Sequence, residues 1–389
     1  MHPVSDHESI DLNCSKSIQI RSLIAGFLYH GKIEDVSSED SSDAHVVHDA
    51  LVRIRHATLL PSPSPVAISA EDCGAAYRFL AAVLSIMPGK WILTGQKRLL
   101  NRPIQSLIDV LIQTGAHIVS CPQGWLIEGR PLHARKLSVD CSQSSQFASA
   151  LLLIGPKIGL EELDISPTPT PSQAYIDMTR QVLSAVCAEK PVPAEGDWST
   201  AAFWYAYLAL SRSINSLQLN LLKMDSVQGD CIIARWMEDW GLVRSIQKSN
   251  GIVIERLGAA SVPDIELDMH DHPDLVPVLV ALAAAYPFRL TMHNVGTLNL
   301  KESRRLDHLA DAIGTLCECQ VIGDKLLYIN GMNRFLVKNF SPLFEVHNDH
   351  RLVMAYQLLR LQFGIRISEM APVAKSYPAF LKYFCEEHT

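Results

Sequence analysis

Six short polar runs in this chain stand directly before apolar stretches with helical spacing, and each run carries hydroxyls, carboxylates or cations. The N-terminus of a helix offers unpaired N–H groups and the positive end of the helix dipole, so each run is a candidate contact for an anion. Several runs also hold Lys or Arg, and together they predict a site that surrounds a strongly negative ligand. The runs are Ser15-Lys16-Ser17 to Arg21, Asp72-Cys73-Gly74 to Arg78, Ser142 to Gln146, Gly196-Asp197-Trp198-Ser199, His270 to Asp274, and Asn348-Asp349-His350-Arg351.

The composition restricts the class of protein. The chain has 389 residues, of which 48% are hydrophobic and 19% charged, and this length is sufficient for two domains. A formal net charge of −7 argues against nucleic acid as a partner, so an anion must be bound by locally concentrated cations. Nine cysteines without CxxC pairs are typical of a reducing compartment. The polar start and the shortness of the apolar run 275–285 predict a soluble, cytoplasmic protein without a membrane partner.

A strand–loop–helix–glycine–strand pattern occurs three times and bears on the architecture. The strands at 91–94, 217–221 and 288–292 each lead through a polar loop into an amphipathic helix, which Gly115, Gly241 or Gly314 closes. The apolar helices of the polar runs stand between these copies. The pattern predicts an α/β protein with βα units in two groups, a loop at 61–65 and a domain boundary within 189–195.

Separated motifs, taken in their order along the chain, make it resemble the 5-enolpyruvylshikimate-3-phosphate synthases, a family of enolpyruvyl transferases. The resemblance runs from about Cys14 to Phe384. Each motif alone is weak, but their joint order and spacing are specific. They are 15–21, 73–78, Leu93-Thr94-Gly95 with 101–104, 144–147, Pro171-Ser172 with 175–177, Gln228-Gly229-Asp230, Pro273-Asp274, Lys301-Glu302-Ser303 with Arg305-Leu306, Asp349-His350-Arg351, and 375–378.

The resemblance implies a two-domain α/β fold in which each domain is built from three βαβαββ units with buried helices. One domain would comprise residues 1–14 and 196–389, and the other residues 15–195. The helix N-termini of both domains would face the cleft between them, which would hold the active site. Substrates would draw the domains together and exclude water.

The resemblance also implies a reaction. The 5-hydroxyl of shikimate 3-phosphate adds to C2 of phosphoenolpyruvate while C3 is protonated, and the tetrahedral intermediate then loses inorganic phosphate. Both substrates carry phosphate and carboxylate, so their approach requires many cations and hydrogen-bond donors. A general acid and a general base must lie near the reacting carbons. The family implies no metal or organic cofactor and usually a monomer.

Most of the implied substrate contacts belong to shikimate 3-phosphate. Arg21 would hold its carboxylate, because a planar guanidinium can pair two oxygens at once. Its phosphate would be held by serines, and Tyr175 would lie against the ring. Asp274 and Lys301 would bind ring hydroxyls. The full set is Lys16, Ser17, Arg21, Ser144, Ser145, Gln146, Ser172, Tyr175, Asp274, Thr297 and Lys301.

Phosphoenolpyruvate would be held by the backbone at Gly74 together with a set of cations. Lys16 and Gln146 would touch both substrates. The proton acceptor of the family corresponds to Asp274, and Glu302 and Lys375 would transfer protons at C3, with His350 nearby. The phosphoenolpyruvate set is Lys16, Gly74, Arg102, Gln146, Arg305, Arg351 and Lys375, and the catalytic set is Asp274, Glu302, Lys375, Lys16 and His350.

Plain structural interpretations stand beside these assignments. A serine before a helix usually caps it, which applies to Ser144 and Ser145. Asp274 after a proline is an ordinary first-turn acid. Arg78, Asp177 and Asp230 are expected to be structural even within the family.

Two other classes of enzyme are weighed against this interpretation. A metal-dependent hydrolase would use ligand types such as those in His270-Asp271-His272 with Asp268 and Asp274, together with His347 and His350, but no recognised ligand motif accompanies them. A related transferase acts on UDP-N-acetylglucosamine, and many of its members carry a cysteine in the loop before the arginine equivalent to Arg102. The loop 95–101 of this chain contains none.

A third alternative is a family member that binds its ligands but has weak or no turnover. Several residues depart from the usual family pattern: Asp72, Ala75, Gln173, Thr297 and Arg304. Asp72 is expected to add negative charge near phosphoenolpyruvate. Because no departure removes a proton-transfer group, an active enzyme is predicted.

Overall fold

The computed structural model describes residues 4–60, 63–192, 194–259, 261–323, 326–334 and 341–384. The chain divides into two compact units. Unit 1 comprises Met1–Ser15 and Ala194–Thr389, and unit 2 comprises Lys16–Pro193. The chain therefore leaves unit 1 after Ser15 and returns to it at Ala194, whereas the sequence placed these crossings after residues 14 and 195.

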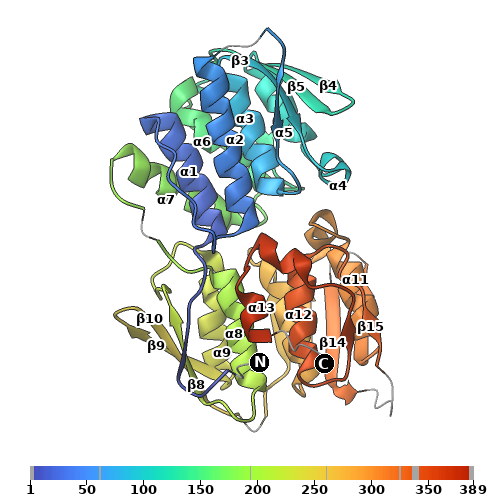
Figure 1. Cartoon of the computed structure of the whole chain (residues 1–389). Helices are drawn as coiled ribbons and strands as arrows, with labels where there is room; N and C mark the ends of the chain where they lie inside the picture. The colour runs from blue at the N-terminus through green and yellow to red at the C-terminus, as the bar shows by residue number, and fades with distance from the viewer. Residues whose placement is uncertain are drawn as a thin grey trace. The chain divides into compact units, whose positions relative to one another are not determined.

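Unit 2 combines one four-stranded sheet with a two-stranded parallel pair. The sheet has the order β2-β3-β5-β4, with β2 and β3 parallel and the other neighbours antiparallel. Helices α1, α2 and α3 run side by side in Figure 1. The elements are α1 (Lys16–His30), α2 (Ser42–Leu59), β2 (Val66–Ser69), α3 (Gly74–Ile86), β3 (Gly89–Thr94), α4 (Lys97–Leu100), α5 (Gln105–Gln113), β4 (His117–Cys121), β5 (Gly124–Gly129), β6 (Lys136–Asp140), α6 (Gln146–Ile158), β7 (Glu162–Ser166) and α7 (Gln173–Cys187).

Unit 1 has two four-stranded sheets, of order β1-β8-β10-β9 and β11-β12-β14-β13, and a parallel pair β15-β16. Its elements are β1 (Glu8–Ile10), α8 (Trp198–Leu210), β8 (Ser216–Asn220), η1 (Gly229–Cys231), α9 (Ile232–Asp239), β9 (Val243–Lys248), β10 (Gly251–Arg256), β11 (Ile265–Asp268), η2 (Pro273–Leu275), α10 (Val276–Ala285), β12 (Arg289–His293), η3 (Gly296–Leu300), α11 (Arg305–Ile313), β13 (Cys317–Ile322), β14 (Leu326–Arg334), β15 (Leu343–Phe344), α12 (His350–Arg360), β16 (Arg366–Ile367), η4 (Ala371–Lys375) and α13 (Phe380–Phe384).

The three four-stranded sheets share one topology, which confirms the predicted α/β class and the threefold pattern. In each sheet two parallel strands linked through a helix are followed by a second helix and an antiparallel hairpin. The pairs β6–β7 and β15–β16 repeat the parallel half of this βαβαββ unit. Gly115 and Gly241 close their helices in the left-handed conformation, but Gly314 does so with an ordinary φ of −57°.

One βαβαββ unit of unit 1 contains the whole of unit 2 as an insertion. β1 pairs in parallel with β8, with Glu8 opposite Leu217, and the chain between them passes through unit 2 before forming α8. Asp6 fixes this join, because its carboxylate accepts hydrogen bonds from the backbone N–H groups of Asn215 and Ser216. The short polar N-terminal segment thus completes a sheet begun far away in the sequence.

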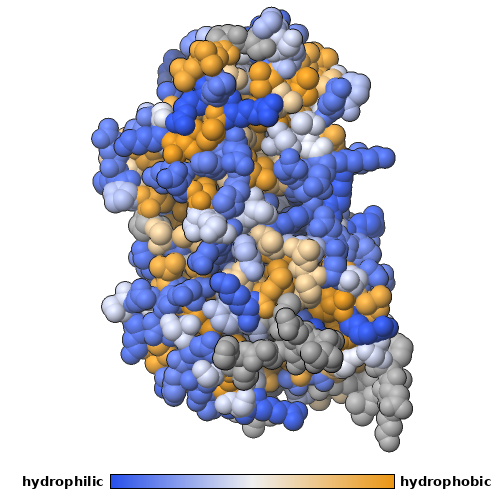
Figure 2. All heavy atoms as spheres, in the orientation of Figure 1, coloured by the Kyte–Doolittle hydropathy of each residue, from blue (hydrophilic) through white to orange (hydrophobic). Residues whose placement is uncertain are grey.

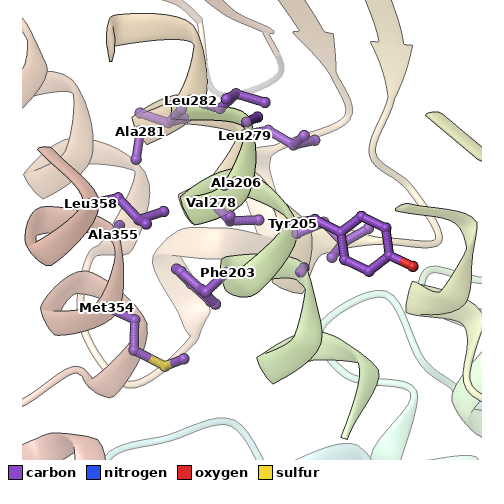
Figure 3. Close-up of a cluster of buried hydrophobic side chains, with 14 of the residues drawn as sticks. Phe203, Tyr205, Ala206, Val278, Leu279, Ala281, Leu282, Met354, Ala355 and Leu358 are labelled. Carbon is purple, nitrogen blue, oxygen red and sulfur yellow. The ribbon is translucent and has the colours of Figure 1, made fainter. Parts of the chain in front are cut away.

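Apolar helices form the interior of unit 1. All residues of α10 are buried, and α8 is buried along nearly its whole length, because neither helix has a polar face to offer to water. Figure 3 shows side chains of α8, α10 and α12 packed on one another, among them Phe203, Leu279 and Met354. These buried helices begin at three of the polar runs, so the core of unit 1 fixes where those runs lie.

The described surface mixes polar and apolar residues. On the face in Figure 2, hydrophilic atoms alternate with separate hydrophobic patches, as is usual for a folded protein in water. Across the described ranges, every helix is too short or too polar to cross a bilayer.

A close backbone approach in unit 1 gives a test of the packing. A Cβ at Gly331 would stand 1.8 Å from the carbonyl oxygen of Ala283 at the end of α10. We expect Gly331→Ala to lower the free energy of unfolding by about 1–3 kcal/mol, because backbone must shift to make room. Gly364→Ala is the matched control, since a Cβ there meets nothing within 4 Å. Equal denaturation midpoints for the two variants would contradict this packing.

Candidate functional site

The first turns of three helices in unit 2 meet around Arg21. Its guanidinium donates hydrogen bonds to the hydroxyls of Thr179 in α7 and Ser149 in α6, and to the carbonyls of Tyr175 and Ser17. It also lies over the rings of Phe79 and Tyr175. Helices α1, α6 and α7 are thereby joined near their N-termini.

Arg21 carries a buried charge that no described carboxylate neutralises by an ion pair. Burial lowers the pKa of Arg21 to about 10, so the group stays protonated at neutral pH. A buried cation held only by hydroxyls, carbonyls and ring faces favours binding of an anion, whose charge would compensate it.

Lys16 begins α1 and forms an ion pair with Asp43, at 3.2 Å between Nζ and Oδ2. Asp43 lies in the first turn of α2, which Ser41 caps by accepting a hydrogen bond from the backbone N–H of Ala44. Asp43 was not among the predicted substrate-binding or catalytic residues. A hydroxyl and an acid before a helical stretch were the available signal, but that signal is common to ordinary helix starts.

Gly74 begins α3 directly against Arg102. A Cβ at Gly74 would stand 2.4 Å from Nη1 of Arg102, so the absent side chain lets the guanidinium approach the helix N-terminus. Arg78, one turn further on, donates to Oε1 of Gln146 at 2.7 Å and to the carbonyl of Pro103. Arg78 is therefore structural, as predicted, and its structural role is to hold Gln146 of α6 beside α3.

The serines divide between capping and other roles. The hydroxyl of Ser144 accepts a hydrogen bond from the backbone N–H of Gln146, so this serine acts as a cap. Ser145 and Ser172 stand at the N-cap positions of α6 and α7 without making such a bond. Ser172 is also held at φ 58°, a conformation that a residue other than glycine rarely adopts and that is found at binding sites. Ser17 lies in the first turn of α1, where its carbonyl accepts from Arg21.

In unit 1, three cations converge on Asp274. Its carboxylate lies 3.2 Å from Nη1 of Arg305, 3.1 Å from Nη2 of Arg351 and 3.7 Å from Nζ of Lys301. Asp274 lies in η2 before α10, whereas Arg351 begins α12 with its neighbour His350. Residues from three separate motifs thus lie together, and their role in binding an anion stays a prediction.

Arg305 is paired with further acids and is almost wholly buried. Asp349 accepts from its Nε and Nη2 at 2.9 and 3.1 Å, and Glu302 accepts from Nη2 at 2.5 Å. Asp349 is also the N-cap of α12 and accepts from the backbone N–H of Arg351. One buried carboxylate therefore holds the guanidinium of Arg305 and caps the helix that carries Arg351. This role of Asp349 was not predicted, although the residue lies in the motif 349–351.

These contacts set the protonation states in unit 1. Burial alone would raise the pKa of Asp274, but Arg351, Lys301 and Arg305 together outweigh it and hold the pKa well below its usual range. Burial lowers the pKa of Lys301, with Asp274 opposing it. Asp274 is accordingly a strongly ionised carboxylate and, in these ion pairs, a weak base.

Three further predicted residues, Thr297, His350 and Lys375, lie in other elements of unit 1. Thr297 lies in η3, which leads to Lys301. His350 is the buried first residue of α12, and Lys375 ends η4, which packs against α12. Their roles at the substrate stay predictions.

Three of the residues that depart from the family pattern, Asp72, Gln173 and Arg304, pair with nearby side chains. Asp72 forms an ion pair with Arg98 of α4, so its carboxylate does not stand as the unbalanced charge that the sequence suggested. Gln173 donates to Asp177, and exposed Arg304 donates to Asp307 in its own helix. None of the three partner residues belongs to the predicted catalytic set.

The described residues do not support the alternative of a metal-dependent hydrolase. Within the described ranges, no three His, Cys, Asp or Glu side chains are gathered as metal ligands would be. His272 instead lies 3.8 Å from Asp230 and packs edge-on against Trp236. Asp230 accepts a hydrogen bond from Ser199, which supports its predicted structural role.

Both units have α/β folds and carry arginines and lysines near the N-termini of their helices. The model of the EPSP synthase (3-phosphoshikimate 1-carboxyvinyltransferase) family matches residues 9–190 and 188–384. The chain therefore belongs to the EPSP synthase family, whose members are transferases of the shikimate pathway.

Individual relatives agree with this family. A 3-phosphoshikimate 1-carboxyvinyltransferase from Bacteroides fragilis is 32% identical over 408 residues, covering 96% of this chain and 93% of the relative. One from Thermococcus kodakarensis is 29% identical, covering 83% and 82%. The solved EPSP synthase of Acinetobacter baumannii has a TM-score of 0.69 at 19% identity, covering 98% of this chain and 96% of that one, and it supports the fold.

The depressed pKa of Asp274 predicts a pH dependence of stability. Ionised Asp274 stabilises the fold above the pKa of an unfolded aspartate, about 3.9, and this contribution is lost as pH falls from there towards the lower folded pKa. We expect Asp274→Asn to lower the free energy of unfolding at pH 7 by on the order of 3 kcal/mol. The difference from wild type should narrow below about pH 4.

Chemical denaturation at several pH values measures this difference. Asp239→Asn removes an exposed carboxylate of the same unit and is the control, with little change expected. A gap between Asp274→Asn and wild type that stays constant from pH 7 to 3 would count against the ion pairs.

Proposed function

We propose that this chain transfers the enolpyruvyl group of phosphoenolpyruvate to the 5-hydroxyl of shikimate 3-phosphate and releases inorganic phosphate. The family membership and the anion-binding character of both units support the proposal. The observation that carries it is the convergence of Arg305, Arg351 and Lys301 on Asp274, because the reaction needs concentrated cations beside a proton acceptor. We further propose a monomeric, cytoplasmic enzyme.

In this proposal, unit 2 binds most of shikimate 3-phosphate. Arg21 takes the carboxylate, which supplies the counter-charge that the buried guanidinium lacks. Ser144, Ser145 and Ser172 bind the phosphate, and Tyr175 lies against the ring. Ser172 supports this assignment, since its hydroxyl does not cap its helix.

Phosphoenolpyruvate is bound by Gly74, Arg102 and Lys16 of unit 2 and by Arg305, Arg351 and Lys375 of unit 1. Gln146 contacts both substrates and is held for this task by Arg78. We propose that the two units act on the same pair of substrates, because each unit supplies cations that the other lacks and four anionic groups have to be neutralised.

The chemistry consists of an addition followed by an elimination. The hydroxyl oxygen forms a bond to C2 as Asp274 takes its proton, and C3 receives a proton from Lys375 or Glu302, with His350 nearby. A proton of C3 then passes back to Lys375 or Glu302 as the C2–O bond to phosphate breaks, which restores a double bond between C2 and C3 and releases inorganic phosphate. Lys301 and Thr297 complete the contacts to shikimate 3-phosphate.

Asp274 has two successive partners in this scheme. An anion that binds Arg305 or Arg351 competes with Asp274 for the same guanidinium groups. Once those cations pair with substrate, less positive charge holds the Asp274 carboxylate, and its pKa rises towards the range of a useful base. Substrate binding therefore activates the proton acceptor.

Release of inorganic phosphate tests the proposed function directly. The assay uses purified full-length protein with shikimate 3-phosphate and phosphoenolpyruvate, and each substrate is omitted in turn. Phosphate release that requires both substrates is expected. Release with only one of them would indicate a hydrolase, and binding of both without release would indicate the family member without turnover.

Lys375→Met should abolish phosphate release in this assay and leave the fold intact, because the proposed role needs the charge only when substrate is bound. A loss of at least about 100-fold in kcat is the expected scale for a proton-transfer group. An unchanged circular dichroism spectrum and melting temperature control for folding. Turnover near that of wild type would remove Lys375 from the mechanism.

Asp274→Asn should bind inorganic phosphate several-fold more tightly than wild type, because the variant removes a carboxylate that competes for Arg305 and Arg351. Turnover should fall at the same time. Isothermal titration calorimetry measures the binding, and Asp239→Asn again serves as the control. Equal or weaker phosphate binding would contradict the competition, even if the enzyme assay succeeds.

A further inference from the structure

Two segments of unit 2 are fastened together beside Gly74. The backbone N–H of Gln96 donates to the carbonyl of Glu71 at 2.6 Å, and Leu99 of α4 is fully buried. The backbone N–H of Arg102 in turn donates to the carbonyl of Leu99 at 2.9 Å, which carries the chain from α4 directly to Arg102. The loop that bears Arg102 is thus attached to the residues that precede α3.

Asp72 and Arg98, which lie in the two segments joined by these hydrogen bonds, form an ion pair. Only 7% of the Asp72 side chain is exposed, against 34% for Arg98. A carboxylate buried to that extent is costly unless a cation pairs with it, so Arg98 has little freedom to leave. Asp72 stands two residues before Gly74, and Arg98 stands four residues before Arg102.

We propose that Asp72 and Arg98 are a charge-balancing pair for the phosphoenolpyruvate subsite. The pair stands beside the close approach of Arg102 to Gly74. It cancels the negative charge of Asp72 before that charge acts on an anionic ligand. This inference rests on the proposed function, in which Gly74 and Arg102 bind phosphoenolpyruvate.

The two single substitutions have opposite electrostatic consequences. Arg98→Gln removes the cation of this ion pair, so the local charge becomes more negative and disfavours phosphoenolpyruvate. Asp72→Asn removes the carboxylate, so the local charge becomes more positive and favours the ligand. The double variant has neither charge, and the remaining backbone and apolar contacts still hold the loop.

Steady-state kinetics on the full-length protein test the pair in a double-mutant cycle. We expect Arg98→Gln to raise KM for phosphoenolpyruvate about tenfold while KM for shikimate 3-phosphate changes by less than about twofold. Asp72→Asn should show a KM for phosphoenolpyruvate no higher than that of wild type. The double variant should recover to within about threefold of wild type.

A double variant as impaired as Arg98→Gln would overturn the charge-balancing role, and so would an equal rise in KM for both substrates. Arg135→Gln is the control, since it removes an exposed ion pair with Glu161 in the same unit and should leave both constants unchanged. If wild-type protein releases no phosphate, the proposed function fails. Calorimetric binding of phosphoenolpyruvate to the same variants then tests the pair separately, and an unchanged affinity in Arg98→Gln would overturn it.

Discussion

Buried positive charge is the constraint on which this protein depends. A guanidinium removed from water is tolerated only when acids, hydrogen-bond acceptors or ring faces surround it. Arg305 forms ion pairs with three carboxylates, whereas Arg21 is surrounded by hydroxyls, carbonyls and aromatic rings. In the proposed function this difference matters, because Arg21 has no ion pair with a described carboxylate and would take its counter-charge from the ligand, whereas Arg305 would exchange one of its acids for the ligand.

The repeated βαβαββ topology brings these cations together. Buried helices such as α8, α10 and α12 are apolar along their length, so polar residues are confined to their ends. Parallel packing of such helices gathers their N-terminal residues, and the helix dipoles add to the charge of the side chains. Acids then limit the excess of positive charge. Asp43 pairs with Lys16 and Asp349 with Arg305, two cations of the proposed binding sets, and Asp72 pairs with Arg98 beside them.

Much of the fold followed from patterns within the sequence. Each polar run does begin a helix, and each strand–loop–helix–glycine–strand copy forms the same part of a sheet. These features are local, since helix caps, hydrophobic periodicity and closing glycines act over a few residues. The insertion of unit 2 between β1 and α8 was implied by the family resemblance and not by a local pattern, because a three-residue strand has little periodicity to detect.

The sequence by itself determined the repeating α/β units, the positions of the helix N-termini and the cations placed there, because each depends on neighbouring residues. Only the tertiary structure decided which charges meet. Asp274 with Arg351, Lys16 with Asp43 and Asp72 with Arg98 are contacts between separate elements. A carboxylate has the same appearance in the sequence whether it lies in water or against a guanidinium, and its surroundings, which only folding creates, fix its pKa and its role.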